Sequence, residues 1–305
     1  MKRKTVTNVA ASVHARLLNV TRQRGGDFNL TLQRYAAERF LYRLGASPLR
    51  ERFVLKGAML FVLWEGPLAR STRDLDLAGY WENDAASLAT AFREICLVSS
   101  PLDGLEFRSN SLQVEPIRDA SEYHGFRVHL DIGLGSAVLR LQVDVGFGDV
   151  VVPPPMDVVY PVLLDGEAPR IRAYPREAVV AEKLHAMVFH GDVNSRYKDF
   201  LDIHVLSQRY PFEGPTLAAA ISATFDRRNS ATFAPWPVAF SAAFYADSDR
   251  ADQWLRYVKR SRVTVAPPPF AEVGDRIVAF LEPAVRAISN GEAFGVNWSP
   301  GGPWR

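Results

Sequence analysis

The sequence predicts an α+β protein, in which a small mixed β-sheet core is flanked by N-terminal helices and a C-terminal helical lobe. Three observations support this class. Apolar residues recur at helical spacing near the N-terminus, alternating patterns typical of strands follow in the middle of the chain, and helical spacing returns after Pro175. The 305 residues are expected to divide into an N-terminal helical segment (1–45), a sheet core (46–170) and a helical lobe (171–305).

The composition is that of an ordinary globular protein, with 48% hydrophobic residues, 23% charged residues and a net charge of +2. This mild charge argues against extensive coating by nucleic acid but allows a local basic patch. Cys96 is the sole cysteine, which excludes an intrachain disulfide and a cysteine-rich metal site. Neither a signal peptide nor an apolar run of about 18 residues is present, so we expect a cytoplasmic protein with no membrane span.

The N-terminal segment is expected to contain two helices. The first covers 8–22 and ends before Gly25-Gly26, and the second covers about 30–44 and ends at Gly45. Ser47-Pro48 suits the start of a short third helix, because serine is a good N-cap and proline fits the first turn.

The sheet core begins with a predicted strand, glycine turn and helix at 53–60, followed by a strand that ends at Leu77. The clearest alternation predicts two further strands at 126–132 and 137–145. Less regular patterns predict a helix at 85–98 and short strands within 105–117, at 158–164 and at 170–173. Helices of the lobe are expected at 176–190, 195–209, 216–226, 249–260 and 271–288. The Gly/Ser/Pro-rich tail from Gly291 is expected to be loose.

Two carboxylates, Asp74 and Asp76, are one residue apart in the second strand and therefore point to the same side. Such a pair repels unless a cation lies between the carboxylates. Mg²⁺ suits them, because it needs one or two carboxylates plus substrate phosphates. This pattern predicts a metal-dependent phosphoryl-group site, and the alternative is a solvated polar strand face.

A third carboxylate is predicted at Asp144, on the polar face of the strand 137–145. It would complete a second metal site and act on the attacking hydroxyl, since two metals stabilise both oxygens of an in-line displacement. Asp131 is the competing residue, because it also faces the polar side of its strand.

Gly57 follows a strand and precedes a helix, where a glycine lets a phosphate approach the backbone. The alternative is a simple strand-to-helix turn. Ala58 follows this glycine, so no hydroxyl is present at that position of the turn. Ser71 and Thr72, just before the aspartate pair, could supply one instead.

The helical lobe contributes a second group of polar residues. Lys183 borders the apolar face of its helix, where it can either snorkel or reach a triphosphate as a point charge. Arg196, Asp199 and Asp202 are three residues apart and share a helix face, and the alternative is a surface ion-pair strip. Basic residues near these motifs could line a cleft for a triphosphate or an RNA end, namely Lys56, Arg70, Arg73, Arg196 and Lys198.

At this point the chain resembles the AbiEii/AbiGii toxins, nucleotidyltransferase-like toxins of type IV toxin–antitoxin and phage-defence systems that include the mycobacterial MenT group. The resemblance extends from about residue 30 to residue 285. It rests on Phe-Val-Leu-Lys-Gly-Ala-Met-Leu at 53–60, Arg-Ser-Thr-Arg-Asp-Leu-Asp-Leu at 70–77, Ala-Glu-Lys-Leu-His-Ala-Met-Val at 181–188 and Ser-Arg-Tyr-Lys-Asp-Phe-Leu-Asp-Ile at 195–203.

The resemblance implies a core like that of the DNA polymerase β superfamily, joined to a helical lobe. It implies transfer of a nucleotide from an NTP with release of pyrophosphate, with Mg²⁺ or Mn²⁺ as the ion, and some members modify the 3′ end of tRNA. Asp74 and Asp76 match the metal-binding pair, Lys183 the nucleotide-contacting lysine and Asp199 the acidic residue of the fourth motif. The residue pattern and the resemblance together give an expected nucleotide-binding set of Lys56, Gly57, Ser71, Thr72, Arg73, Lys183 and Arg196.

The predicted function is therefore a metal-dependent nucleotidyltransferase toxin that acts on an RNA, with a tRNA 3′ end as the leading acceptor. A cognate antitoxin encoded nearby is implied by the family alone. One alternative is nucleotide transfer to a protein or small molecule. Another is an inactive module that only binds NTP or RNA, which the Gly57-Ala58 turn favours and the intact Asp74 and Asp76 disfavour.

Overall fold

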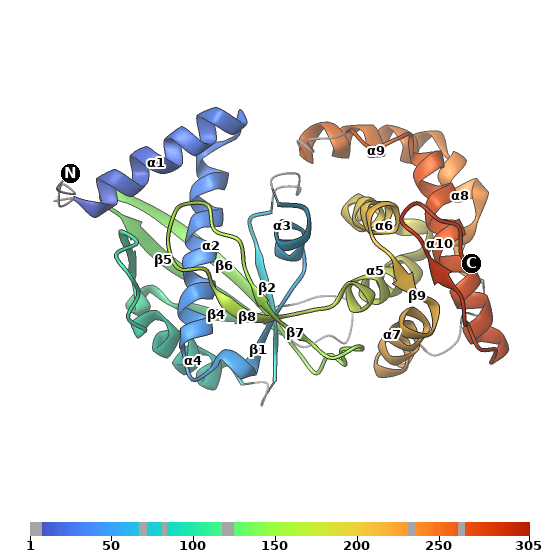
Figure 1. Cartoon of the computed structure of the whole chain (residues 1–305), viewed down its shortest axis with the longest axis horizontal. Helices are drawn as coiled ribbons and strands as arrows, with labels where there is room; N and C mark the ends of the chain where they lie inside the picture. Colours follow the sequence, from blue (N-terminus) through green and yellow to red (C-terminus); the bar gives the residue numbers. More distant parts are fainter. Residues whose placement is uncertain are drawn as a thin grey trace. The chain divides into compact units, whose positions relative to one another are not determined.

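The computed structural model describes residues 8–66, 72–80, 84–117, 125–230, 233, 236–261 and 266–305. The chain forms two compact units (Figure 1). Unit 1 contains the residues up to Gly148 together with Met156–Ala173, and unit 2 contains Asp149–Pro155 and Tyr174–Arg305. A mixed sheet and many helices confirm the predicted α+β class. Within the described ranges, no helix is long and apolar enough to cross a membrane.

Unit 1 is built on a mixed eight-stranded sheet in the order β3-β5-β6-β2-β1-β8-β7, with β4 also paired to β5. Its strands are β1 (Phe53–Lys56), β2 (Leu75–Gly79), β3 (Leu105–Phe107), β4 (Gln113–Pro116), β5 (Gly125–Leu134), β6 (Ala137–Phe147), β7 (Met156–Val159) and β8 (Arg170–Ala173). Its helices are α1 (Val9–Arg24), α2 (Phe28–Ala46), α3 (Met59–Glu65) and α4 (Ala85–Leu97), with short 3₁₀ helices η1 (Arg50–Arg52) and η3 (Ser109–Ser111).

One face of the central strands packs into the core of unit 1. Leu55, Leu77 and Val145 are in register across β1, β2 and β6, and each is almost completely buried. Helices α2 and α4 extend this core through Phe40 and Phe92, whose ring centroids are 5.2 Å apart. Because side chains alternate along a strand, burial of this leucine and valine face places the intervening polar residues on the opposite face.

Two predicted elements of unit 1 are wrong in position. The strand expected at 158–164 is β7, Met156–Val159, and it ends early because Pro161 has no N–H with which to extend the ladder. Ser47-Pro48 does not begin a helix. The Ser47 hydroxyl instead accepts the N–H of Leu49 in a turn, and the short 3₁₀ helix begins at Arg50.

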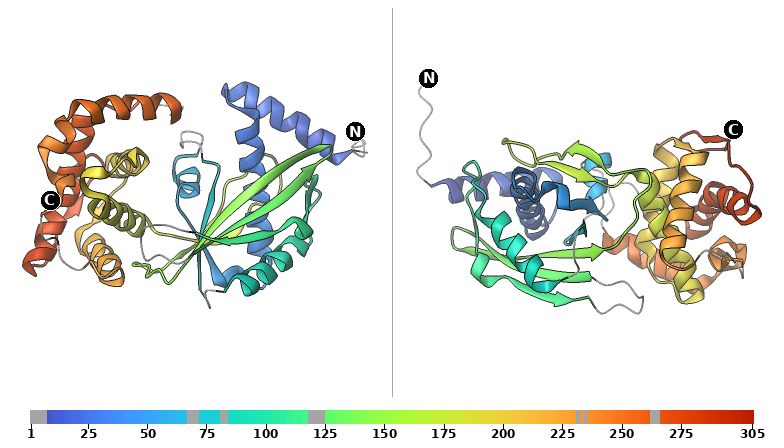
Figure 2. Two further views of the ribbon diagram at one scale, coloured as in Figure 1. Left: turned by 180° about the vertical axis from the view of Figure 1, so that it is seen from behind. Right: turned by 90° about the horizontal axis from the view of Figure 1, so that it is seen from below.

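Unit 2 is helical, with one two-stranded sheet. Its helices are α5 (Arg176–His190), α6 (Tyr197–Arg209), α7 (Gly214–Arg227), α8 (Ala242–Ala246), α9 (Ser248–Ser261) and α10 (Phe270–Asn290), with 3₁₀ helices η4 (Gly191–Val193) and η5 (Val238–Phe240). Helix α10 packs against α6, α7, α8 and α9, and α5 packs against α7 (Figure 2). Aromatic rings fill the centre, and Phe270 contacts Phe200, Tyr245 and Trp254.

The tail of unit 2 is packed, so the expectation of a loose segment from Gly291 is wrong. Strands β9 (Phe212–Glu213) and β10 (Asn297–Trp298) pair, and Trp298 is 1% exposed. Its indole N–H donates to the carbonyl of Ser207 at 2.7 Å. Burial of aromatic surface therefore holds a tail whose glycines and prolines suggested disorder.

A buried ionic cluster joins α2 to the rest of unit 1. The Arg43 guanidinium donates to Asp103 at 2.6 Å, and Glu38, which is fully buried, accepts the Leu163 N–H at 2.7 Å. Burial raises the pKa of Glu38 to about 7, although Leu163 and the nearby Arg39 oppose this shift. Glu38 is therefore near its midpoint of ionisation at neutral pH.

We expect Glu38→Gln to remove a pH dependence of stability. A carboxyl whose pKa is higher in the folded than in the unfolded chain stabilises the fold below its unfolded pKa, and this contribution is lost as pH rises through about 7. The full loss amounts to roughly 3 kcal/mol, of which about 2 kcal/mol falls between pH 5.5 and 8.5. Urea unfolding at pH 5.5 and 8.5 checks this: the wild type should lose stability relative to the variant at the higher pH, and an equal change in both proteins would contradict it.

Candidate active site

The strand–turn–helix at the start of the sheet core brings Gly57 against a predicted metal ligand. Gly57 lies between β1 and α3 with φ +71°, a left-handed conformation that favours glycine. A Cβ built at this position would lie 2.1 Å from Oδ2 of Asp76. The backbone of the turn thus packs directly on this carboxylate, and a larger residue would displace it. Lys56, the preceding residue, pairs in register with Asp76 across the antiparallel strands.

The predicted carboxylates come together on the polar face of the sheet. Strands β2 and β6 are parallel, and Asp76 pairs in register with Asp144. Adjacent strands are about 4.8 Å apart, so these two residues are neighbours. Asp74 lies two residues before Asp76 and is exposed, whereas Asp76 and Asp144 are half-buried. The structure therefore places Asp144 beside Asp76, with Asp74 two residues before Asp76 on the same strand.

Asp144 is held by Arg127, which is not among the site residues predicted from the sequence. The Arg127 guanidinium donates from Nε to Oδ1 of Asp144 at 2.9 Å and from Nη2 to Oδ2 at 2.8 Å. Gln142 donates to Oδ1 at 3.2 Å. The hydrogen bonds to Asp144 raise the pKa of Arg127 above its ordinary value, and the charge of Asp74 acts in the same direction. Arg127 alternates with the apolar residues of its predicted strand. This alternation is the only feature of the sequence that places it on the polar face.

The alternative third carboxylate, Asp131, lies elsewhere. It pairs in register with Arg140, whose Nε donates to it at 3.0 Å. Asp131 is four residues along β5 from Arg127, roughly 13 Å in an extended strand. Strand β5 is also separated from β2 by β6. Of the two candidates, Asp144 is the one beside Asp76.

The carboxylates fit a magnesium ion that is completed by substrate. Among the side chains that the structure describes, no group of three or more His, Cys, Asp or Glu residues is placed to hold a metal by itself. Mg²⁺ nevertheless needs only one or two carboxylates when phosphate oxygens and waters fill its remaining positions. Asp74 and Asp76 supply an oxygen donor set of this kind.

The remaining predicted nucleotide-binding residues of unit 1 are only partly placed. Ser71 lies outside the described residues, as does Arg70. The Thr72 hydroxyl donates to the carbonyl oxygen of Asp74 at 3.3 Å, so it stabilises the approach to β2. Arg73 is exposed beside it.

In unit 2, helices α5 and α6 bury the polar residues of the third and fourth motifs as one network. Nζ of Lys183 lies 2.7 Å from Oδ1 of Asp199 and 2.7 Å from Oδ2 of Asp202. Both aspartate side chains are no more than 3% exposed. Arg196, which is 41% exposed, donates from Nε to the second oxygen of Asp199 at 2.7 Å. The network is buried, in contrast to the surface ion-pair strip considered as its alternative.

Ion pairs join Lys183 to Asp199 and Asp202, and Arg196 to Asp199, so opposite charges lie side by side in the network. Burial alone would raise the pKa of Asp199, but Lys183 and Arg196 hold it well below its usual range. Asp199 is therefore ionised at neutral pH and fixes both cations through its two oxygens. The adjacent Tyr197 is a core residue, 5% exposed, whose hydroxyl donates to Gln253.

A buried histidine of unit 2 resembles part of a catalytic triad, but its protons are wrongly placed for that chemistry. Nε2 of His185 lies 3.2 Å from the Ser230 hydroxyl, and Nδ1 lies 3.1 Å from Nη1 of Arg228. Because arginine can only donate, Nδ1 accepts and Nε2 carries the proton. Burial, followed by the charge of Arg228, lowers the pKa of His185 to about 4. It cannot take a proton from Ser230, so its hydrogen bonds to Ser230 and Arg228 are structural.

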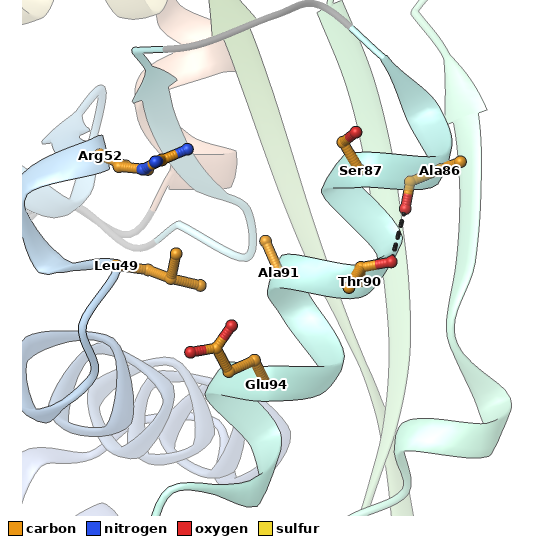
Figure 3. A pocket seen from close by; sticks show the side chains of 7 residues that line it. All are labelled: Leu49, Arg52, Ala86, Ser87, Thr90, Ala91 and Glu94. Carbon is orange, nitrogen blue, oxygen red and sulfur yellow. Dashed lines mark hydrogen bonds between the residues drawn. The ribbon is translucent and has the colours of Figure 1, made fainter.

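A pocket of about 680 Å³ in unit 1 lies away from the carboxylates (Figure 3). Small side chains of α4 line it, flanked by Arg52 and Glu94. Arg52 directly precedes β1, whereas Gly57 follows the other end of that strand. The pocket is therefore at the opposite end of β1 from the candidate site.

Comparisons with known proteins agree with the motifs. A family model described as nucleotidyl transferase AbiEii toxin, type IV TA system, matches residues 39–276. No curated protein matches the chain. Two crystal structures from Helicobacter pylori match the chain. One is a candidate nucleotidyltransferase, with 16% identity over 86% of this chain and 97% of that chain and a TM-score of 0.46. The other is JHP933, with 15% identity over 84% and 92% and a TM-score of 0.45.

Proposed function

Because the chain belongs to the AbiEii family of nucleotidyltransferase toxins of type IV toxin–antitoxin systems, we propose that it transfers a nucleotide from an NTP to the 3′ end of a tRNA. In this reaction the 3′-hydroxyl oxygen bonds to the α-phosphorus, and the bond from that phosphorus to the β-bridging oxygen breaks. Pyrophosphate leaves, and the hydroxyl proton passes to a base. Such a change would block aminoacylation, and therefore translation and growth.

The observation that supports this proposal is that Asp76 lies against the Gly57 turn and beside Asp144 on the polar face of the central strands. Burial of the opposite leucine and valine face fixes the direction of these carboxylates. The tight turn at Gly57 fixes the carboxylate of Asp76 further. A placement of this kind supports the proposal, because phosphoryl transfer depends on charge that is positioned before the reaction.

The candidate site residues of unit 1 have the following proposed roles. Asp74 and Asp76 would hold Mg²⁺ or Mn²⁺, which supplies positive charge to the reacting phosphate when bound. Lys56, Thr72 and Arg73 would contact the nucleotide. The predicted role of Asp144 as a ligand of a second ion and as an aid to deprotonation stays a prediction.

The proposed roles in unit 2 rest on the motif match and on the network. Lys183 and Arg196 would contact phosphate oxygens, which suits a point charge and a planar guanidinium respectively. Asp199 would position both cations, because each of its oxygens bonds one of them. Asp202, whose role the sequence left open, shares Lys183 and helps to keep it in place.

The biological setting follows from the family. A type IV toxin implies a cognate antitoxin. We propose that the chain acts in the cytoplasm, where its NTP and tRNA substrates occur, and that it serves phage defence or growth control.

The acceptor can be tested with purified full-length protein, each of the four α-labelled NTPs, Mg²⁺ and total tRNA. We expect label in tRNA with at least one NTP. Periodate-oxidised tRNA, which lacks the 3′-hydroxyls, is the matched control and should stay unlabelled. Label in protein or small molecules alone would contradict the tRNA proposal and leave nucleotide transfer in place. Binding of NTP without any transfer would favour the inactive module.

A further inference from the structure

The pairing of Arg127 with Asp144 differs from an ordinary surface ion pair. The guanidinium donates to both carboxylate oxygens, from Nε at 2.9 Å and from Nη2 at 2.8 Å. The Gln142 amide donates a further hydrogen bond to Oδ1 of Asp144. A carboxylate has about four lone-pair directions, so three of those of Asp144 are already used by donors within the fold.

The position of this pair matters as much as its geometry. Asp144 is the in-register neighbour of Asp76 across parallel strands, and the charge of Asp74 acts on Arg127. Arg127 also pairs in register with Glu115 on its other side. The guanidinium therefore contributes a fixed positive charge within the group of carboxylates to which the sequence alone assigned two metal ions.

We propose that Arg127 takes the place of a second cation, so that the active site binds one divalent ion, on Asp74 and Asp76. This inference rests on the proposed function. A divalent ion on the Asp144 oxygens would be repelled by the guanidinium that already holds them, whereas an ion on the other two aspartates need not displace it. Arg127 is then a positioning residue, because it acts through Asp144 and supplies charge without binding substrate.

The same two strands provide a matched control. Arg140 and Asp131 also form a pair across β5 and β6, through one hydrogen bond at 3.0 Å. This pair is more exposed, with the two side chains 52% and 28% accessible against 36% and 20% for Arg127 and Asp144. It is a cross-strand ion pair of the same chemistry away from Asp76.

The test counts Mn²⁺ ions bound to the full-length protein with a non-hydrolysable α,β-methylene NTP, by electron paramagnetic resonance titration. We expect one Mn²⁺ per chain in the wild type and a second, weaker one in Arg127→Gln. Arg127→Lys, which keeps the positive charge, should return the count to one, and Arg140→Gln should leave it at one. Circular dichroism confirms that each variant is folded.

Two equivalent Mn²⁺ ions in the wild type, or a count that Arg127→Gln does not change, would overturn the inference. Either result leaves nucleotide transfer intact. Absence of Mn²⁺ binding in every protein would instead reject both the metal site of the proposed function and this assignment. Loss of stability alone, without a change in the count, would reduce Arg127 to a structural residue.

Discussion

Asp76→Asn is expected to lower the rate of nucleotide transfer by roughly a thousandfold, because loss of an ion ligand removes about 4 kcal/mol of charge stabilisation at the reacting phosphate. Asp76 is the residue at which three features of unit 1 meet. It pairs in register with Lys56 and with Asp144, and its carboxylate packs on Gly57. Asparagine keeps the shape of the side chain but not its charge. Single-turnover rates with saturating NTP and Mg²⁺ measure the effect.

The control for this substitution is Asp131→Asn, which removes a carboxylate from the same face of the sheet outside the site. It should leave the rate within about twofold of the wild type, since surface substitutions away from a site have small effects. Expression in cells should show the same contrast in growth inhibition. Equal rates for Asp76→Asn and wild type would remove this residue from the reaction.

Lys183→Met is expected to destabilise the protein by about 3–5 kcal/mol, in addition to any effect on activity. The substitution leaves Asp199 and Asp202 buried with one cation fewer, and both side chains are nearly inaccessible to water. Arg196 still bonds one oxygen of Asp199, so this carboxylate keeps one of its two cations. Urea denaturation followed by circular dichroism measures the free energy of unfolding.

Lys198→Met is the matched control, because this lysine is exposed in the same motif. It should change the free energy of unfolding by less than about 0.5 kcal/mol. A loss of activity in Lys183→Met without a loss of stability would show that the network is not structural and that Lys183 acts on substrate alone. Equal losses of stability in the two variants would show that burial of Lys183 does not determine its contribution to the free energy of unfolding.

The polar face of the sheet could be predicted because strand parity is a local property. Alternation alone placed Asp74 and Asp76 on one side and Asp144 on the polar side of its strand. Register is not local, however, since it depends on which strands pair and with what offset. The sequence therefore could not choose between Asp144 and Asp131, and it could not show that Arg127 lies opposite Asp144.

In the helical lobe, the sequence predicts which residues share a helix face but not how the helices pack. Helical spacing correctly placed Asp199 and Asp202 on one face, but burial of that face depends on how α5 packs beside α6. The prediction of a loose tail from Gly291 was wrong for a related reason. Its glycines and prolines suggest disorder, whereas Trp298 and Trp304 gain burial only once α10 provides Phe280 as a surface.

The most direct test of nucleotide transfer compares the fate of two labels. The purified protein is incubated with tRNA, Mg²⁺ and the same NTP labelled at either the α- or the γ-phosphate, with and without EDTA. Label from the α-phosphate should enter the RNA in a metal-dependent way. Label from the γ-phosphate should be released as pyrophosphate and should not enter the RNA. Transfer of the γ-label to the acceptor, or α-label transfer that survives EDTA, would contradict metal-dependent nucleotide transfer by Asp74 and Asp76.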